Sequence, residues 1–432
     1  MMASKKGLLT AALLTFFFKA YALDLTDVFH TLSDPFYNMV DPNEGLTSFS
    51  SLNIPCGGRE ESLGGAFTGL CDDICFFDYN PAASCLLPKG EVAVFHNSWI
   101  ADSNMETLAW ADRFGDLGLG AKIKCFYVPF TEYNYFGDRV AANYYSETTG
   151  CVNISYNFFH GYYFKGLAVG ANLKTSWRSV PDYTNNEDNS IIKGSGLSQS
   201  SLGVMADFGA MLSFDFFKNF ASREPNLKVG ASVLNVGAAF TGFGSQGSFK
   251  IDDPLPTAAA IGVSYRLLKR LAFCADFRQP LNLQDFSKSG RWSAGIGIDF
   301  TVTDYLEFMA GFRLKGANPR FSLGTEFKIK RFIFDINYTL DLTSSLNPVN
   351  HFSLSARVGL GDHGRKQKQE RCDDLYTKGL DEYAKGNEAA AVEYWQAALK
   401  EDKAWTPAQR WIDTVNNSHK LYERVLDIQS LD

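Results

Sequence analysis

Residues 320–341 read RFSLGTEFKIKRFIFDINYTLD, two consecutive runs in which apolar and polar residues alternate. In the first run Phe321 and Leu323 share one parity, and charged residues take the other. Successive side chains of a β-strand point to opposite faces of a sheet, so each run predicts a strand with one apolar and one polar face. Residues 292–302 and 352–360 repeat the pattern. The sequence therefore predicts a β-protein, and the open question is which solvent meets the apolar face.

The alternation continues from residue 91 to residue 361 without a linker, which favours one large sheet over several domains. Hydrophobic residues make up 45% of the 432 residues and aromatic residues 14%, yet no run of 18 apolar residues follows the N-terminus. This excludes a protein built on membrane-spanning helices. The net charge of −7, with dispersed Lys and Arg, argues against nucleic-acid binding.

Alternation and turn residues together predict about fourteen antiparallel strands. Connections predicted to be short, near 114–116, 268–269, 303–304 and 330–331, mostly alternate with long polar ones at 130–149, 175–200, 241–254, 282–289 and 342–350, and the connection 214–226 breaks this rhythm. The predicted strands are 91–99, 105–113, 117–129, 150–159, 161–174, 201–213, 227–240, 255–267, 270–281, 290–302, 305–315, 319–330, 331–341 and 351–361.

Alternating short and long connections are typical of an up-and-down barrel in a bacterial outer membrane. A soluble sandwich or barrel would also have one apolar face. Size favours the membrane barrel, because a closed sheet of about fourteen strands is too wide for its own side chains to fill. Its polar face should then line the lumen, and its apolar face should meet lipid. We predict an all-β membrane barrel over residues 89–361.

The N-terminus has the features of an export signal over residues 1–22. Lys5 and Lys6 precede the apolar run 7–18, and Ala20-Tyr21-Ala22 fits the small-residue cleavage rule. A structural helix is the alternative for this run. Residues 23–88 follow as a lead-in and a compact insert, in which glycines and an Asn-Pro turn take the place of long apolar runs.

Eight cysteines in an exported chain raise the question of disulfides. Four of them, Cys56, Cys71, Cys75 and Cys85, lie close together in the sequence, so we expect one or two bridges at most, within this group. The alternative to disulfide bridges is a zinc site at Cys71 and Cys75. It would need a second ligand pair, which the scattered histidines do not supply. No metal or other cofactor is therefore expected.

After residue 361 the periodicity becomes helical. A charged linker over 364–371 is predicted to lead into two antiparallel helices, and a third helix is predicted over 406–431. The small and aromatic residues Gly379, Ala391, Trp395 and Ala398 fit the positions of a tetratricopeptide repeat, although the proline expected near Lys403 is missing. Residues 362–432 therefore form either a helical hairpin packed under the barrel or a docking module. An even number of strands would place this tail in the periplasm.

Three features before the first strand carry a resemblance to a known family: the run Gly64-Gly65-Ala66-Phe67-Thr68-Gly69, the pair Asp72-Asp73, and Tyr79-Asn80-Pro81-Ala82-Ala83. The sequence resembles the N-terminal hatch of FadL-like outer-membrane proteins, which include transporters of long-chain fatty acids and aromatic hydrocarbons and the PorV-type proteins. The tetratricopeptide-like tail resembles an uncharacterised spirochaetal branch of this group. The resemblance covers residues 1–361.

The resemblance implies a hatch-plugged barrel through which apolar ligands diffuse without an energy source. It implies that Asn80, Pro81 and Ala82, with Gly64 and Gly65, border the ligand path. The expected ligand is a long-chain fatty acid or another hydrophobic molecule, in a protein surrounded by outer-membrane lipid. A carboxylate head group would favour a cationic partner. Candidates on polar strand faces are Arg278, Arg291, Arg313 and Lys328; the alternative role of each is a lumen-wall charge balanced by nearby acids.

A second hypothesis is a PorV-like platform that binds exported or periplasmic proteins, with the C-terminal helices recruiting the partner. An enzyme is the weakest reading. The sequence contains no Gly-x-Ser-x-Gly, no His-Glu-x-x-His and no P-loop, so no motif places a catalytic set. The sequence differs from the transporters mainly in its helical tail. This tail is what favours partner binding over simple uptake.

Overall fold

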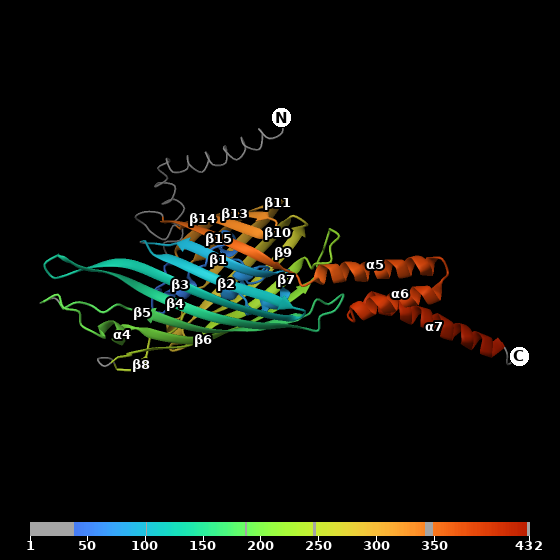
Figure 1. The fold of residues 1–432 in the computed structure, drawn as a ribbon, viewed down its shortest axis with the longest axis horizontal. Helices are drawn as coiled ribbons and strands as arrows, with labels where there is room; N and C mark the ends of the chain where they lie inside the picture. The colour runs from blue at the N-terminus through green and yellow to red at the C-terminus, as the bar shows by residue number, and fades with distance from the viewer. Residues whose placement is uncertain (1–38, 101, 186–187, 245–247, 342–348, 430–432) are drawn as a thin grey trace, which may run out of the picture.

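The described part of the computed structural model comprises residues 39–100, 102–185, 188–244, 248–341 and 349–429. The predicted signal peptide lies outside it. Fourteen strands form one closed antiparallel barrel, and a two-residue strand, β8, adds to β7 (Figure 1). Closure comes from the pairing of the first and last strands, with Phe95 opposite Ser355, and β6 pairs with β7 on the far side of the ring. The predicted fold class is confirmed.

The strands follow one another around the ring, except that β9 follows β7. Their bounds are β1 Gly90–Ser98, β2 Asn104–Phe114, β3 Leu117–Tyr133, β4 Arg139–Phe158, β5 Leu167–Ser179, β6 Ser201–Phe214, β7 Leu227–Thr241, β8 Lys250–Ile251, β9 Thr257–Leu268, β10 Leu271–Leu281, β11 Ser293–Thr303, β12 Leu306–Lys315, β13 Asn318–Ile329, β14 Phe332–Asp341 and β15 Val349–Gly361. Two short helices lie in the connections, α4 Ser195–Gln199 and η6 Phe286–Lys288.

The two faces of the barrel wall follow the alternation of the sequence. Phe321, Phe334 and Ile296 are exposed on the outside, at 38%, 41% and 58% of their surface, whereas Glu326 and Asp335 are buried inside. This is the distribution predicted for a barrel with an apolar exterior and a polar interior. Among the described residues, no helix is both long and apolar enough to cross a bilayer.

The prediction of a long connection over 130–149 is wrong. Strands β3 and β4 continue through it, pairing as far as Tyr133 opposite Arg139. They extend beyond β2, whose pairing with β3 ends at Tyr127. Pro129 therefore lies on an edge that needs no N–H donor, which is where a strand tolerates proline. Because these two strands extend beyond the rest of the barrel wall there, the apolar alternation that reveals the other strands weakens.

The lumen is filled by residues 49–88, which we call the interior segment (Figure 1). It contains four short helices: η3 Ser50–Asn53, α3 Arg59–Ser62, η4 Ile74–Asp78 and η5 Pro81–Leu86. Its apolar side chains, including Phe67, Phe76 and Phe77, are almost completely buried and form one cluster with inward side chains of the wall. The compact insert predicted before the first strand thus lies inside the barrel.

Glycines of the wall let the interior segment pack closely. A Cβ atom built on Gly311 of β12 would lie 2.1 Å from the main-chain nitrogen of Gly64, and one on Gly170 of β5 would lie 2.3 Å from the carbonyl oxygen of Pro81. Contacts this short are not found for real side chains, so these wall positions require glycine. The wall and the interior segment fit each other backbone to backbone.

The prediction of disulfides is wrong, since all eight cysteines are free. In the interior segment each thiol meets a different group: Cys56 the carboxylate of Asp78, Cys71 the carbonyl of Phe67, and Cys85 the carbonyl of Ala82. Proximity in the sequence therefore does not bring these thiols together. No group of His, Cys, Asp or Glu side chains in the described ranges is arranged to hold a metal ion.

The C-terminal region forms three helices, α5 Arg365–Ala384, α6 Glu388–Glu401 and α7 Thr406–Gln429, at the end of the barrel where the last strand leaves it (Figure 1). The expected helices are present. The charged linker predicted for 364–371 is wrong, because from Arg365 onward these residues are the first turns of α5. Lys, Gln, Glu and Arg are strong helix formers. These first turns are exposed on most sides, so their sequence lacks the apolar residues at helical spacing by which a packed helix is recognised.

Candidate functional site

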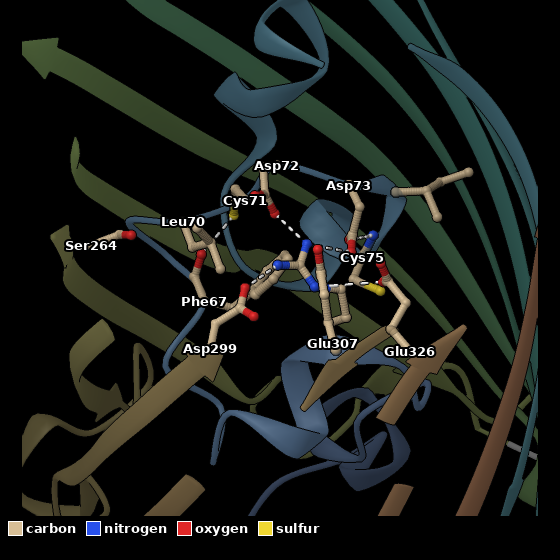
Figure 2. A network of polar contacts seen from close by, with 12 residues as sticks. Phe67, Leu70, Cys71, Asp72, Asp73, Cys75, Ser264, Asp299, Glu307 and Glu326 are labelled. Carbon is tan, nitrogen blue, oxygen red and sulfur yellow. Dashed lines mark hydrogen bonds and ion pairs between the residues drawn. The ribbon is translucent and has the colours of Figure 1, made fainter. Parts of the chain in front are cut away.

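Arg59, at the start of α3, is one of the buried cations that hold the interior segment. Its guanidinium lies 2.6 Å from Asp72 and 3.3 Å from Asp73, both in the interior segment. It also lies 2.6 Å from Asp299 of β11 and 3.7 Å from Glu326 of β13. Figure 2 shows these labelled acids converging from the interior segment and from the wall. One side chain thus joins the interior segment to two wall strands.

Arg357 of β15 makes the same connection from the wall side. It is 2% exposed, and its guanidinium lies 3.0 Å from Asp73 and 3.1 Å from Asp335, with a shorter ion pair to Glu326. Glu91 of β1 lies 3.8 Å away. Since β1 and β15 close the barrel, Arg357 links the closing strands to the interior segment. Charge-assisted hydrogen bonds of this kind are the stronger ones in proteins.

The environment of the interior segment shifts its carboxylic acids in opposite directions. Burial tends to raise the pKa of Asp72, but Arg59, helped by Lys228 and Arg266, lowers it below its ordinary value. Glu60 has no such cation, and burial raises its pKa well above the usual range. One oxygen of Glu60 is buried without a hydrogen-bond partner, which fits a neutral acid.

Asn80, predicted as part of the hatch motif, is fully buried and caps η5. Its side-chain oxygen accepts a hydrogen bond from the main chain of Ala82 at 3.1 Å, and its amide nitrogen donates to the carbonyls of Thr68 and Ala210. Pro81 follows as the first residue of η5, and its carbonyl accepts from Asn153 of β4 at 2.9 Å. The motif therefore fastens η5 to the wall.

Gly64 and Gly65, the other predicted hatch residues, both have positive φ, at 65° and 73°. They line a small pocket between the interior segment and strands β10 to β12. The phenol of Tyr79 and the carboxylate of Asp276 also line it. Asp276 accepts hydrogen bonds from the main chain of Phe67 and Thr68, at 3.1 and 2.7 Å, and so fixes this side of the pocket.

Of the four predicted carboxylate partners, the structure brings two together. Arg278 of β10 and Arg313 of β12 both line this pocket, and neither forms an ion pair with a carboxylate of the described residues. Arg278 donates to the carbonyl of Asp78 at 3.2 Å and lies over the ring of Tyr79. The pocket thus holds two guanidinium groups that form no ion pair within the described residues and one carboxylate, that of Asp276. This excess of positive charge suits an anionic group.

The other two predicted partners are placed differently. Lys328 forms ion pairs with Glu307 and Glu326, at 2.5 and 2.8 Å, so its charge is already balanced. Arg291 was predicted to lie on a polar strand face, which is wrong: it precedes β11, and its side chain is exposed. It begins a strand-like run in the sequence, but its main-chain nitrogen donates to Asp41 of the lead-in at 2.7 Å, and the strand itself begins two residues later, at Ser293.

The sequence pattern does not predict Arg59 and Arg357 as anchors, nor Tyr79 as part of the pocket. Arg59 follows a glycine pair in the predicted insert, and a charged residue within a compact insert was the available signal. Arg357 stands at an inward position of an alternating strand, where many polar residues occur. Only the fold shows that these two cations share Asp73 and Glu326.

These features define a closed β-barrel whose lumen is filled by its own N-terminal segment and which keeps a cationic pocket beside that segment. The chain belongs to the uncharacterised protein family UPF0164, whose sequence model matches residues 37–362. Two UPF0164 proteins of Treponema pallidum (strain Nichols) are similar to it. One is 29% identical over 390 residues, covering 88% of this chain and 85% of the relative, and the other is 27% identical, covering 88% and 78%.

Two solved structures are similar at low sequence identity. The Pseudomonas putida toluene transporter TodX is 12% identical with a TM-score of 0.48, and the match covers 71% of this chain and 98% of that chain. A Pseudomonas aeruginosa FadL homologue is also 12% identical, with a TM-score of 0.41, covering 69% of this chain and 97% of that one.

Proposed function

We propose that this protein is an outer-membrane barrel for the passive uptake of hydrophobic small molecules, with long-chain fatty acids as the leading ligands. The observation that carries the proposal is the pocket at Arg278 and Arg313, where two guanidinium groups outnumber the single carboxylate of Asp276 inside a barrel whose outer face is apolar. A fatty acid combines a chain suited to apolar surfaces with a head group suited to guanidinium groups. The FadL-like sequence motifs before the first strand support the same ligand class.

The outer surface supports a location in the outer membrane. Exposed large apolar side chains recur on the outward face of successive strands, including Ile123, Ile154, Ile261, Ile296 and Leu323. A contiguous apolar band of this kind is unfavourable in water and suits the hydrocarbon core of a bilayer. With the tail at the rim that carries the tightest turns, we propose that the helices lie in the periplasm.

Binding of a fatty acid is expected to depend on the two pocket arginines. Replacing Arg313 with alanine should weaken binding of a fluorescent long-chain fatty acid about tenfold, since a hydrogen bond to a charged group contributes roughly 1.5–3 kcal/mol. Arg278→Ala should have a similar effect. Titration of the detergent-extracted protein measures both.

Lys328→Ala is the matched control, because Lys328 is occupied by Glu307 and Glu326. It should leave affinity for the fatty acid within about twofold of the wild type. Arg291→Ala should behave likewise, since that side chain is exposed. Unchanged affinity in all four variants would rule out a role for these cations in ligand binding. Mass spectrometry of lipids that co-purify with the protein would identify the ligand class independently.

A platform for protein partners is the second candidate, favoured by the helical tail. In α5 and α6, Gly379 lies against the buried Trp395, because a Cβ atom on Gly379 would lie 2.3 Å from the indole nitrogen. This close helix contact is the small-and-aromatic pairing expected for a tetratricopeptide-like hairpin. Such a platform would retain a periplasmic protein during purification and would carry no bound lipid, and deletion of the tail should abolish the retention of the protein.

A further inference from the structure

The interior segment leaves the lumen beside the start of the C-terminal tail. Its last residues, Leu87 and Pro88, lead into β1 at Gly90, and Gly90 pairs with Gly361, the last residue of β15. The chain therefore passes from the end of the barrel to α5 directly next to the exit of the interior segment. The closing pair of strands brings together two regions that are far apart in the sequence.

Arg365, the first residue of α5, holds this exit. Its guanidinium donates hydrogen bonds to the carbonyl oxygens of Leu87 at 3.1 Å and Pro88 at 2.8 Å. Two residues earlier, the ring of His363 lies 2.8 Å from the carboxylate of Asp112 at the end of β2. The beginning of the tail is thus bound both to the barrel rim and to the last two carbonyls of the interior segment.

A second set of contacts fixes the tail to two longer loops at the same rim, residues 159–166 and 215–226. Arg223 forms an ion pair with Asp373 of α5, and its guanidinium lies 4.8 Å from the ring centre of Trp405. The ring of Tyr162 lies 5.0 Å from that of Trp405. Arg410 donates to the hydroxyl of Tyr163 at 3.2 Å. The connection 214–226, too long for a tight turn, is therefore part of the docking surface of the tail.

We propose that the C-terminal tail is a strap that controls the exit of the interior segment. When the tail is docked on the two loops, Arg365 holds Leu87 and Pro88 in place; when the tail is displaced, that end of the interior segment is released. This inference rests on the proposed uptake function, because the strap would regulate the path that the hydrophobic ligand takes through the barrel. It assigns the tail a role in the barrel itself.

The contacts that hold the middle of the interior segment are stronger than the contacts that hold the tail, and this difference determines which region opens first. Arg59 and Arg357 anchor the middle of the interior segment through buried ion pairs, and breaking one of these is costly. The contacts of the tail are partly exposed, with Arg223 and Asp373 at 37% and 40%, and such pairs contribute little each. Local opening starts where protection is weakest, so the exit opens before the anchored middle.

Hydrogen exchange of the full-length protein in detergent micelles tests the strap. Arg223→Glu, which acts on the tail contact and leaves the exit residues unchanged, should raise amide exchange at residues 84–90 about tenfold, as local opening becomes easier. Arg365→Ala should raise it at least as much. The charge swap Arg223→Glu with Asp373→Arg restores the ion pair and should return exchange toward the wild-type rate.

Arg371→Glu is the matched control, because it makes the same substitution at an exposed residue whose ion pair, with Glu401, lies within the tail. It should leave exchange at residues 84–90 unchanged. If Arg223→Glu speeds exchange in α5 to α7 but not at residues 84–90, or in neither region, the strap is refuted. Fatty-acid uptake is measured separately in proteoliposomes. Absence of uptake would count against the proposed function and leave the exchange result standing.

Discussion

Replacing Arg357 with methionine is expected to destabilise the barrel by about 3–5 kcal/mol, the cost of leaving buried charges without their partner. The guanidinium contacts Asp73, Glu326 and Asp335, and all three carboxylates lie in the lumen away from solvent. Methionine fills similar volume, so the loss is electrostatic and not a cavity effect. Heat- or denaturant-induced unfolding in detergent, followed by the mobility of the folded barrel on a gel, measures the difference.

Arg331→Met is the matched control, since Arg331 lies exposed in the tight turn after β13. It should change stability by less than about 0.5 kcal/mol. Adding Asp335→Asn to Arg357→Met should recover part of the loss, because it removes one of the unpaired charges. Equal stability of the two arginine variants would mean that the acids around Arg357 are neutral in the folded protein.

The barrel could be predicted because its pattern is local. In a strand such as β13, Phe321 and Leu323 face outward while Glu326 faces the lumen, and the alternation of the sequence records this directly. The same pattern fails where the surroundings change. Beyond Tyr127, β3 pairs with β4 but no longer with β2, and there the sequence does not distinguish a strand from a loop. The first turns of α5 are exposed on most sides, so they show no helical period.

The site was harder to predict, because its contacts join residues distant in the sequence. Arg278 and Arg313 are predicted as carboxylate partners from their positions on polar strand faces. The sequence around Lys328 has the same alternation, so it does not separate Lys328 from the two arginines. What separates them is the neighbouring strand: Lys328 lies beside Glu307 of β12, whereas Arg313 faces the glycines of the interior segment. Lumenal charges can be predicted from alternation, but the pairs they form depend on register and on the path of residues 49–88.

The glycines of the barrel wall also depend on the path of residues 49–88. Inward positions of neighbouring strands carry glycine where the interior segment passes. A Cβ atom on Gly324 of β13 would lie 1.9 Å from the hydroxyl of Ser62, and one on Gly295 of β11 would lie 2.6 Å from the carbonyl of Gly64. At Gly311 the three nearest atoms are all main-chain atoms of residues 62–64, so no side chain can rotate away.

Gly311→Ala is therefore expected to displace the interior segment around Leu63 and Gly64, where the new methyl carbon would lie 2.3 and 2.1 Å from main-chain atoms. Overpacking costs about 1–3 kcal/mol where neighbours can adjust, and an obstacle made of main-chain atoms puts this site at the upper end. Unfolding in detergent should show the loss, and hydrogen exchange should rise at residues 58–66. Gly150→Ala on β4, whose nearest neighbour is 3.8 Å away, should alter neither. A similar response in both variants would show that the interior segment adapts to the wall and does not depend on close backbone contact.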